Sequence, residues 1–146
     1  SYLPYNRGCH HSFWSIIENT PAGATLHFMN ENIDGGDILF RKKIKIFSYI
    51  SAQEIQERSE KLAMQLLKQH IEKILKGNFS LTKQTKFTYH SKKDILSKTV
   101  LNSKDKIKVS DLFNLFRATF NKENGFFIKF NKNKFFIKIE KYQKVK

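Results

Sequence analysis

A long amphipathic helix at residues 51–77 is the sequence feature that most constrains the fold. Ser51 and Glu54 have the spacing of a helix capping box, and Gly77 is placed to end the helix. Apolar side chains recur between them at three- and four-residue intervals, which is typical of a helix with one buried face. They are Ile55, Leu62, Leu66, Leu67, Ile71, Ile74 and Leu75. We therefore expect this stripe to pack in a hydrophobic core.

Two strands are predicted ahead of this helix, at residues 24–29 and 38–47, because both segments are rich in β-forming side chains. The residue types at the start of the loop between them match the first positions of a calcium-binding EF-hand loop. However, Arg41 stands where a glutamate should close the site, and an EF-hand needs flanking helices. Two glycines permit a tight turn, but a turn alone leaves the flanking carboxylates of Asp34 and Asp37 unexplained.

Two further helices are predicted on either side of this central part. Residues 10–20 read as a short helix that ends at a Thr-Pro pair, and residues 109–120 read as a helix capped by Ser110. Residues 78–98, between the long helix and the last one, read as a connector.

A β-hairpin is predicted at residues 126–139, with its turn at 131–134. A hairpin alone is marginally stable, so we expect it to pack onto a domain or a second subunit, and self-association is our hypothesis. Its other face alternates phenylalanine with lysine, as nucleic-acid stacking platforms do, and that reading stays an alternative. The apolar face carries Phe126, Ile128, Phe130, Phe135, Ile137 and Ile139.

Charge is distributed unevenly along the 146 residues. Residues 1–40 carry a formal charge of −3 and the remainder +17, giving the total of +14. Such an excess attracts nucleic acid, anionic lipid or a phosphorylated small molecule, although many lysines can also be ordinary solvated surface. Cys9 is a single cysteine and cannot form an internal disulfide, and no apolar run is long enough to span a bilayer. We expect a cytoplasmic protein.

The motifs of residues 1–42 resemble the formyltransferases that use 10-formyltetrahydrofolate. YLPYNRG, FWSI, TPAGATLHFM and ENIDGGDIL follow one another in the order and spacing of that family's signature. YNRG followed by CHHSFWS is most similar to the enzymes that formylate amino sugars on nucleotide carriers. TYHSKKD and LFNLFRATF also resemble the connector and small C-terminal region of those enzymes. The sequence departs from them at His11, Ser12, Asn30, Asn32 and Gly35.

The resemblance implies an α/β fold: the C-terminal part of a Rossmann-like formyltransferase domain, followed by a small α+β tail with a β-hairpin. We expect the catalytic-domain part at residues 1–80, a connector at 81–108 and the tail at 109–146. Ser1 takes the place of the serine that ends the family's Asn-x-His-x-Ser motif. We therefore expect the catalytic Asn and His to precede this chain, and the 146 residues alone to be inactive.

The implied activity is transfer of a formyl group from the co-substrate 10-formyltetrahydrofolate to the amine of a nucleotide-linked amino sugar, by a homodimer joined through the hairpin. Two alternatives stay open. One is methionyl-tRNA formyltransferase, which the basic C-terminal part favours, although the tail is short for a tRNA-binding barrel. The other is a non-catalytic product of a split gene that dimerises or binds polyanions.

The resemblance also assigns residue roles. It implies that Asp34 orients a catalytic imidazole, stabilises its cationic form and helps to relay the proton that the attacking amine sheds. The expected turn residue is Asp37, which braces the loop. The residues expected to bind substrate or co-substrate are Arg7, Gly8, His10, Gly35 and Gly36.

A metal site is not expected. Cys9, His10 and His11 are consecutive and could be imagined around zinc together with His27, but consecutive residues rarely converge on one ion and the usual spacers are missing.

Overall fold

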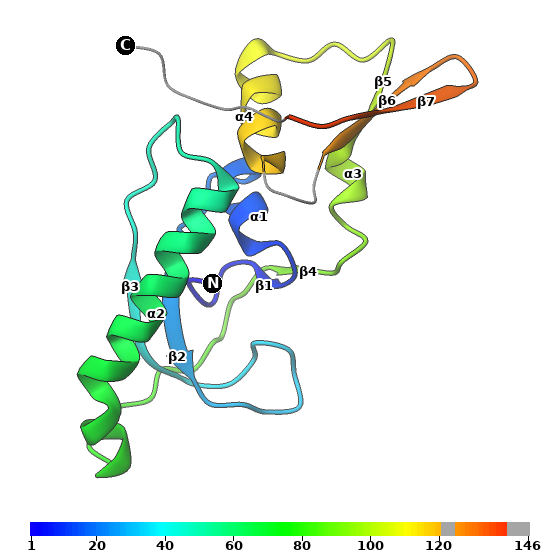
Figure 1. Ribbon diagram of the computed structural model, residues 1–146. Coiled ribbons are helices and arrows are strands. Elements are labelled where there is room, and N and C mark those ends of the chain that lie inside the picture. The colour runs from blue at the N-terminus through cyan, green and yellow to red at the C-terminus, as the bar shows by residue number, and fades with distance from the viewer. Residues whose placement is uncertain (121–124, 140–146) are drawn as a thin grey trace.

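The computed structural model of the chain describes residues 1–120 and 125–139. No helix within these ranges has the length and apolar character needed to cross a membrane. The elements, in chain order, are β1 (Arg7–Gly8), α1 (His11–Ile17), β2 (Gly23–His27), β3 (Ile38–Lys43), α2 (Ala52–Leu75), β4 (Tyr89–His90), α3 (Leu96–Thr99), β5 (Val100–Asn102), α4 (Val109–Thr119), β6 (Phe126–Phe130) and β7 (Asn133–Ile137) (Figure 1).

The capping box of α2 forms as predicted. The backbone N–H of Ser51 donates to Glu54 Oε2 at 3.0 Å, and the N–H of Glu54 donates to Ser51 Oγ at 3.2 Å. Gly77 follows the helix with φ +66°, a conformation that glycine adopts without strain. Both ends of the helix are therefore fixed by the residues that the sequence indicated.

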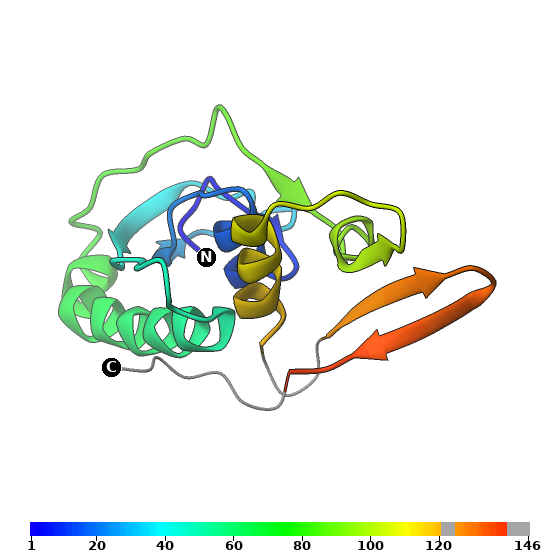
Figure 2. The ribbon, with the colours of Figure 1, turned by 90° about the horizontal axis from the view of Figure 1, so that it is seen from above.

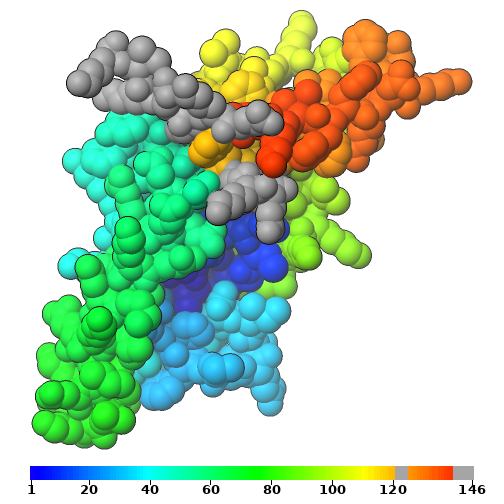
Figure 3. Space-filling model, viewed as in Figure 1, coloured from blue at the N-terminus to red at the C-terminus, as the bar shows by residue number. Residues whose placement is uncertain are grey.

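Only the first half of the apolar stripe on α2 is buried. Ile55, Leu62 and Leu66 are at most 8% exposed and pack in the core. In contrast, Ile71 is 39% and Leu75 79% exposed, because the second half of the helix extends past the elements that cover the first (Figure 3). The expectation that the whole stripe is core was wrong for this distal half.

The strands β2 and β3 form an antiparallel pair against α2, with Leu26 opposite Phe40. Ala24 of β2 lies in a small core cluster with Leu62 and Leu66 of α2. This packing fixes the two ends of the loop that joins the strands, and that loop carries Asp34.

The main core lies where α1, α2 and α4 meet. Phe13 and Trp14 of α1, Ile55 of α2 and Leu115 of α4 are each at most 3% exposed. Figure 2 shows α4 lying over α1, with α2 on one side and the hairpin projecting on the other. The core therefore joins the N-terminal elements to the tail.

The predicted hairpin forms between β6 and β7, but it belongs to a three-stranded sheet. The strand β5, which the sequence did not indicate, pairs in parallel with β6. Ile128 and Ile137 pack against the main core, whereas Phe130 and Phe135 near the hairpin tip are 55% and 51% exposed. The apolar face is thus partly buried within the chain itself.

The cap predicted for α4 was wrong. The N-cap is Lys108 and makes no side-chain capping bond, so Ser110 already lies in the first turn of the helix. Its hydroxyl instead donates to Asp111 Oδ1 at 3.4 Å.

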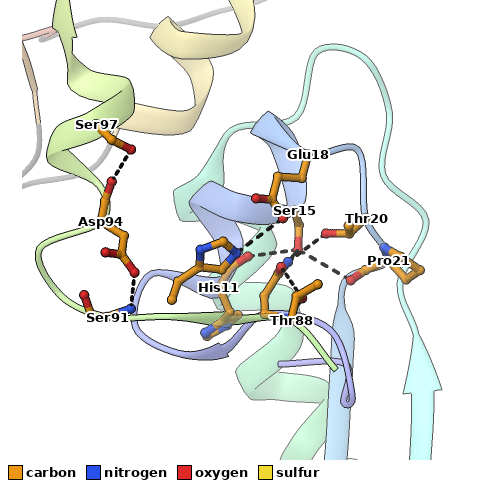
Figure 4. Close-up of polar contacts among 11 residues, drawn as sticks. His11, Ser15, Glu18, Thr20, Pro21, Thr88, Ser91, Asp94 and Ser97 are labelled. Atoms are coloured by element: carbon orange, nitrogen blue, oxygen red, sulfur yellow. Dashed lines mark hydrogen bonds and ion pairs between the residues drawn. The ribbon is translucent and has the colours of Figure 1, made fainter. Parts of the chain in front are cut away.

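The connector returns to the N-terminal segment, where β4 pairs in parallel with β1. Beside this pair, the buried amide of Asn6 donates from Nδ2 to Ser15 Oγ at 3.2 Å and to Thr20 Oγ1 at 2.7 Å, while Thr88 Oγ1 donates to Asn6 Oδ1 at 3.3 Å (Figure 4). A side chain with three polar contacts to distant segments fixes β1 relative to α1 and β4.

A second contact at this junction involves His90. Its ring stacks on Trp14 at 3.8 Å between centroids. Its Nε2 lies 3.3 Å from Oε2 of Glu18, which follows α1 (Figure 4). The connector is therefore held against α1 by both an aromatic and a polar contact.

Candidate functional site

The loop at residues 28–37 is shaped by its glycines. A Cβ on Gly36 would collide with the carbonyl of Phe28, and one on Gly35 would come within 2.6 Å of Asn32 Cβ. The N–H of Phe28 donates to the backbone carbonyl of Asp37 at 3.0 Å and closes the loop. The loop therefore turns tightly enough to set Asp34 against β1.

Asp34 lies in this loop with φ +53°, a left-handed conformation that is uncommon for a residue with a side chain. Its Oδ2 accepts a hydrogen bond of 2.9 Å from the backbone N–H of Gly8, and its Oδ1 lies 3.8 Å from His27 Nε2. The carboxylate is 31% exposed. It is thus oriented by the hydrogen bond from Gly8, lies beside His27 and is still open to a ligand.

His27 was not assigned a role from the sequence, and the structure places it beside Asp34. Its Nδ1 lies 2.8 Å from the backbone oxygen of Phe28. Because a carbonyl only accepts hydrogen bonds, Nδ1 carries the proton in the neutral ring, and Nε2 presents its lone pair toward Asp34. A proton taken up at Nε2 would form an ion pair with the carboxylate.

Gly8 and Arg7 come to this point on β1. A Cβ on Gly8, which has φ +88°, would lie 2.5 Å from the carbonyl oxygen of His90, so only glycine lets β1 and β4 approach this closely. Arg7 is 5% exposed, its guanidinium lies 3.9 Å from the ring centroid of Phe87, and its Nε donates to Gln84 Oε1 at 3.1 Å. The cation is therefore preorganised close to the loop at residues 28–37, which we call the acidic loop.

The two histidines at the start of α1, His10 at the N-cap and His11 as the first helical residue, are both uncharged at neutral pH. Burial lowers the pKa of His11 to about 4, and burial together with the charge of Lys92 lowers the pKa of His10. His10 is the N-cap of α1 with φ +58°; its side chain makes no capping hydrogen bond, and its backbone carbonyl accepts from the N–H of Trp14 at 3.1 Å. Burial thus keeps both rings neutral, and a pKa of about 4 makes His11 a weak proton acceptor.

In the part of the chain that the structure describes, three cavities lie beside these residues. One of about 430 Å³ is lined by Arg7, Phe87 and Tyr89 together with residues 31–33 of the acidic loop. A second of about 250 Å³ is lined by His10 and His11 with residues of α1, α2 and α4.

The third cavity, of about 530 Å³, is basic. Four cations line it, Arg41, Lys43, Lys83 and Lys86, and none of its described lining residues is a carboxylate. Tyr2 lies among the cations, with its ring centroid 4.9 Å from the guanidinium of Arg41. Phosphate groups and flat rings are the chemical partners that such a lining favours.

The structure brings five of the residues predicted from the sequence to one place. Arg7 and Gly8 on β1 meet the loop that carries Asp34, Gly35 and Gly36. His10 lines the separate cavity beside α1, and Asp37 closes the loop through its backbone carbonyl. Among the residues that the structure describes, no cluster of three or more His, Cys, Asp or Glu side chains could hold a metal ion.

The sequence of the chain is similar to that of known formyltransferases. Residues 1–71 match the formyl transferase family. The chain is 24% identical over 141 residues to a dTDP-4-amino-4,6-dideoxyglucose formyltransferase of Mycobacterium tuberculosis, an alignment that covers 94% of this chain and 60% of that protein. The chain therefore spans about 60% of the length of this relative.

Two solved structures are similar over most of the chain. A sugar N-formyltransferase from Shewanella sp FDAARGOS_354 has a TM-score of 0.85 at 30% identity, covering 99% of this chain and 59% of that one. An N-formyltransferase from Helicobacter canadensis, in complex with folinic acid and dTDP-3-aminofucose, has a TM-score of 0.74 at 26% identity, covering 90% and 49%. The predicted family resemblance and α/β fold are confirmed.

Proposed function

Since residues 1–71 match the formyl transferase family and the described chain has the fold of solved sugar N-formyltransferases, we propose that the protein moves a formyl group from 10-formyltetrahydrofolate to the amine of a nucleotide-linked amino sugar. The observation that carries the proposal is the carboxylate of Asp34, which accepts from Gly8 N–H and faces His27 inside the matched segment. The folate complex of the Helicobacter canadensis relative supports the choice of co-substrate.

Residues of this chain contribute to a route for the proton. Bound 10-formyltetrahydrofolate supplies the formyl group: the bond between the amine nitrogen and the formyl carbon forms, the bond from that carbon to the folate N10 breaks, and a proton moves from the amine to the departing N10. Nε2 of His27 presents a lone pair, and Asp34 Oδ1 at 3.8 Å stabilises the imidazolium that results. Asp34 is therefore the residue that we assign to catalysis, with His27 beside it.

Substrate recognition is assigned to the cations around the site. A nucleotide-linked sugar carries phosphate groups, and Arg41, Lys43, Lys83 and Lys86 line one cavity without an opposing carboxylate among the described residues. Arg7, preorganised over Phe87, adds a cation next to the acidic loop. In this account Gly8, Gly35 and Gly36 let the backbone approach the ligands, and His10 lines the neighbouring cavity.

The assembly and location are proposed on separate grounds. Exposed Phe130 and Phe135 at the hairpin tip support a homodimer through this hairpin. Cys9 is exposed and unpaired, which fits the reducing cytoplasm. We keep the division into residues 1–80, 81–108 and 109–146; residues 121–124 and 140–146 of the last part lie outside the described residues.

A substrate panel tests the proposed function. The intact protein, supplied with 10-formyltetrahydrofolate, is expected to formylate dTDP- or UDP-linked amino sugars, as followed by mass spectrometry, and to leave methionyl-tRNA unchanged. Formylation of methionyl-tRNA alone would favour the alternative that the basic C-terminal part suggested. Binding of polyanions without any transfer would favour the non-catalytic alternative.

A further inference from the structure

Gln84 joins the acidic loop to β1 through its side-chain amide. Its Nε2 donates to the backbone carbonyl of Asp34 at 2.9 Å and to that of Gly36 at 2.5 Å, while its Oε1 accepts from Arg7 Nε at 3.1 Å. The reversed amide would place an oxygen against two carbonyls and an NH₂ group against an N–H donor. Only the observed orientation satisfies all three partners.

The position of Gln84 is fixed by the backbone on both sides of it. Thr82 exchanges two backbone hydrogen bonds of 2.9 Å with Ile38 at the start of β3, and Thr88 accepts one of 2.9 Å from the N–H of Arg7. Between these two anchors, Gln84 is half-buried while Lys83 and residues 85–87 are exposed. Its side chain is therefore directed into the protein by the segment that carries it.

The contacts of Gln84 determine where the carboxylate of Asp34 can lie. The carbonyls of Asp34 and Gly36 fix the peptide planes on both sides of Gly35, where the chain turns. Asp34 itself has φ +53°, a conformation that persists only when its surroundings hold it. The bond from Gly8 N–H to Oδ2 sets one end of the side chain, and Gln84 sets the backbone at the other.

We propose that Gln84 is a positioning residue for the reaction: it acts through Asp34 by holding the acidic loop at a fixed distance from β1. Arg7 completes the arrangement, because the same amide also receives its Nε–H. The kinetic part of this inference rests on the proposed function. Its structural part, the coupling of Gln84 to the bond between Gly8 and Asp34, does not.

Kinetics of the intact protein test the catalytic consequence. Gln84→Ala is expected to lower kcat about ten- to a hundredfold, the scale of a misplaced catalytic group, and to raise KM for the nucleotide-linked amino sugar by a smaller factor, because Gln84 also contacts Arg7 and lines the basic cavity. Gln84→Glu keeps the acceptor for Arg7 but loses both donors, so it should not restore kcat. Gln53→Ala is the matched control, because Gln53 on α2 is half-buried like Gln84 and its amide donates to Glu57 across a solvent-exposed contact.

A double-mutant cycle distinguishes positioning from general damage. In an Asp34→Asn background, Gln84→Ala should cause almost no further loss, because the group that it positions is already gone. Losses that multiply independently in the double mutant would overturn the proposal, as would wild-type kcat for Gln84→Ala.

Hydrogen exchange tests the structural part without any activity. The N–H of Gly8, bonded to Asp34 Oδ2, should exchange at least about tenfold faster in Gln84→Ala and at the wild-type rate in Gln53→Ala. Unchanged protection of Gly8 would overturn the proposal even for an active enzyme. An intact protein that transfers no formyl group, yet shows faster exchange at Gly8, would contradict the proposed function and leave the positioning role of Gln84 in the loop supported.

Discussion

At the scale of single residues, the proposed chemistry depends most on the carboxylate of Asp34. Asp34→Asn keeps the size of the side chain but removes the charge that would stabilise an imidazolium at His27. We expect kcat of the intact protein to fall by about two to four orders of magnitude, the range seen when an orienting acid is lost. Steady-state kinetics measure this loss, and circular dichroism verifies that the fold is kept.

Asp37→Asn is the matched control on the same loop. Asp37 closes the loop through its backbone carbonyl, which asparagine retains. This variant should therefore stay within a few-fold of wild type. Equal losses in Asp34→Asn and Asp37→Asn would indicate that the loop, rather than the carboxylate of Asp34, controls the rate.

The lowered pKa of His11 predicts how the stability of the protein depends on pH. Burial lowers the pKa of His11 in the folded protein from 6.5 to about 4. Between these two values the unfolded chain binds a proton that the folded chain does not, so the free energy of unfolding decreases as the pH falls through this window. Urea unfolding at pH 7 and pH 5 should show a smaller loss of stability in His11→Gln than in wild type. A pKa near 6.5 for His11, measured by NMR, would contradict this prediction.

Single residues also show where sequence reasoning reached its limit. Asp34, Gly35 and Gly36 could be assigned because they are contiguous within a recognisable motif. Gln84 lies fifty residues from Asp34, in a segment without regular structure, and its role exists only once β4 pairs with β1. A side chain that hydrogen-bonds to backbone carbonyls leaves no pattern in the sequence. Neither the hydrophobic period nor the spacing of a motif could therefore indicate the role of Gln84.

At the scale of elements, the exposed end of the hairpin predicts self-association. Ile128 and Ile137 pack on the core of their own chain, so charged substitutions there would damage folding. Phe130 and Phe135 are more than half exposed on the same face, and Phe130→Lys combined with Phe135→Lys should shift the sedimentation coefficient toward the monomer.

Val109→Lys is the control for the hairpin variant, because Val109 is 83% exposed and lies at the start of α4. It should leave the assembly unchanged. A wild-type protein that sediments as a monomer at all concentrations would rule out dimerisation through the hairpin.

The elements themselves were predictable to different degrees. The capping box and the apolar period identified α2, and alternation identified β6 and β7, because these signals are local. The three-residue strand β5 gave no such signal, since it is defined by its pairing with β6. The exposure of Leu75 could not be predicted either, because the period of a helix does not show how far its neighbours extend.

At the scale of the whole molecule, the structure shows where part of the net charge of +14 lies. Four cations of the basic C-terminal part meet in the cavity of about 530 Å³ beside Tyr2 and Tyr5. The composition alone could not separate a nucleic-acid partner from solvated lysines or a small anion. The gathering of these cations around one open cavity, beside tyrosine rings, is compatible with the phosphates of the proposed nucleotide-linked substrate.

The most direct test of the central claim is the stoichiometry of the reaction catalysed by the intact protein. Tetrahydrofolate release is followed by absorbance, and N-formylated sugar nucleotide and free formate are quantified by mass spectrometry and an enzymatic assay. The account predicts equal amounts of tetrahydrofolate and formylated sugar nucleotide, no formate, and the loss of both products in Asp34→Asn. Tetrahydrofolate released together with an equal amount of formate, and without formylated sugar, would contradict it.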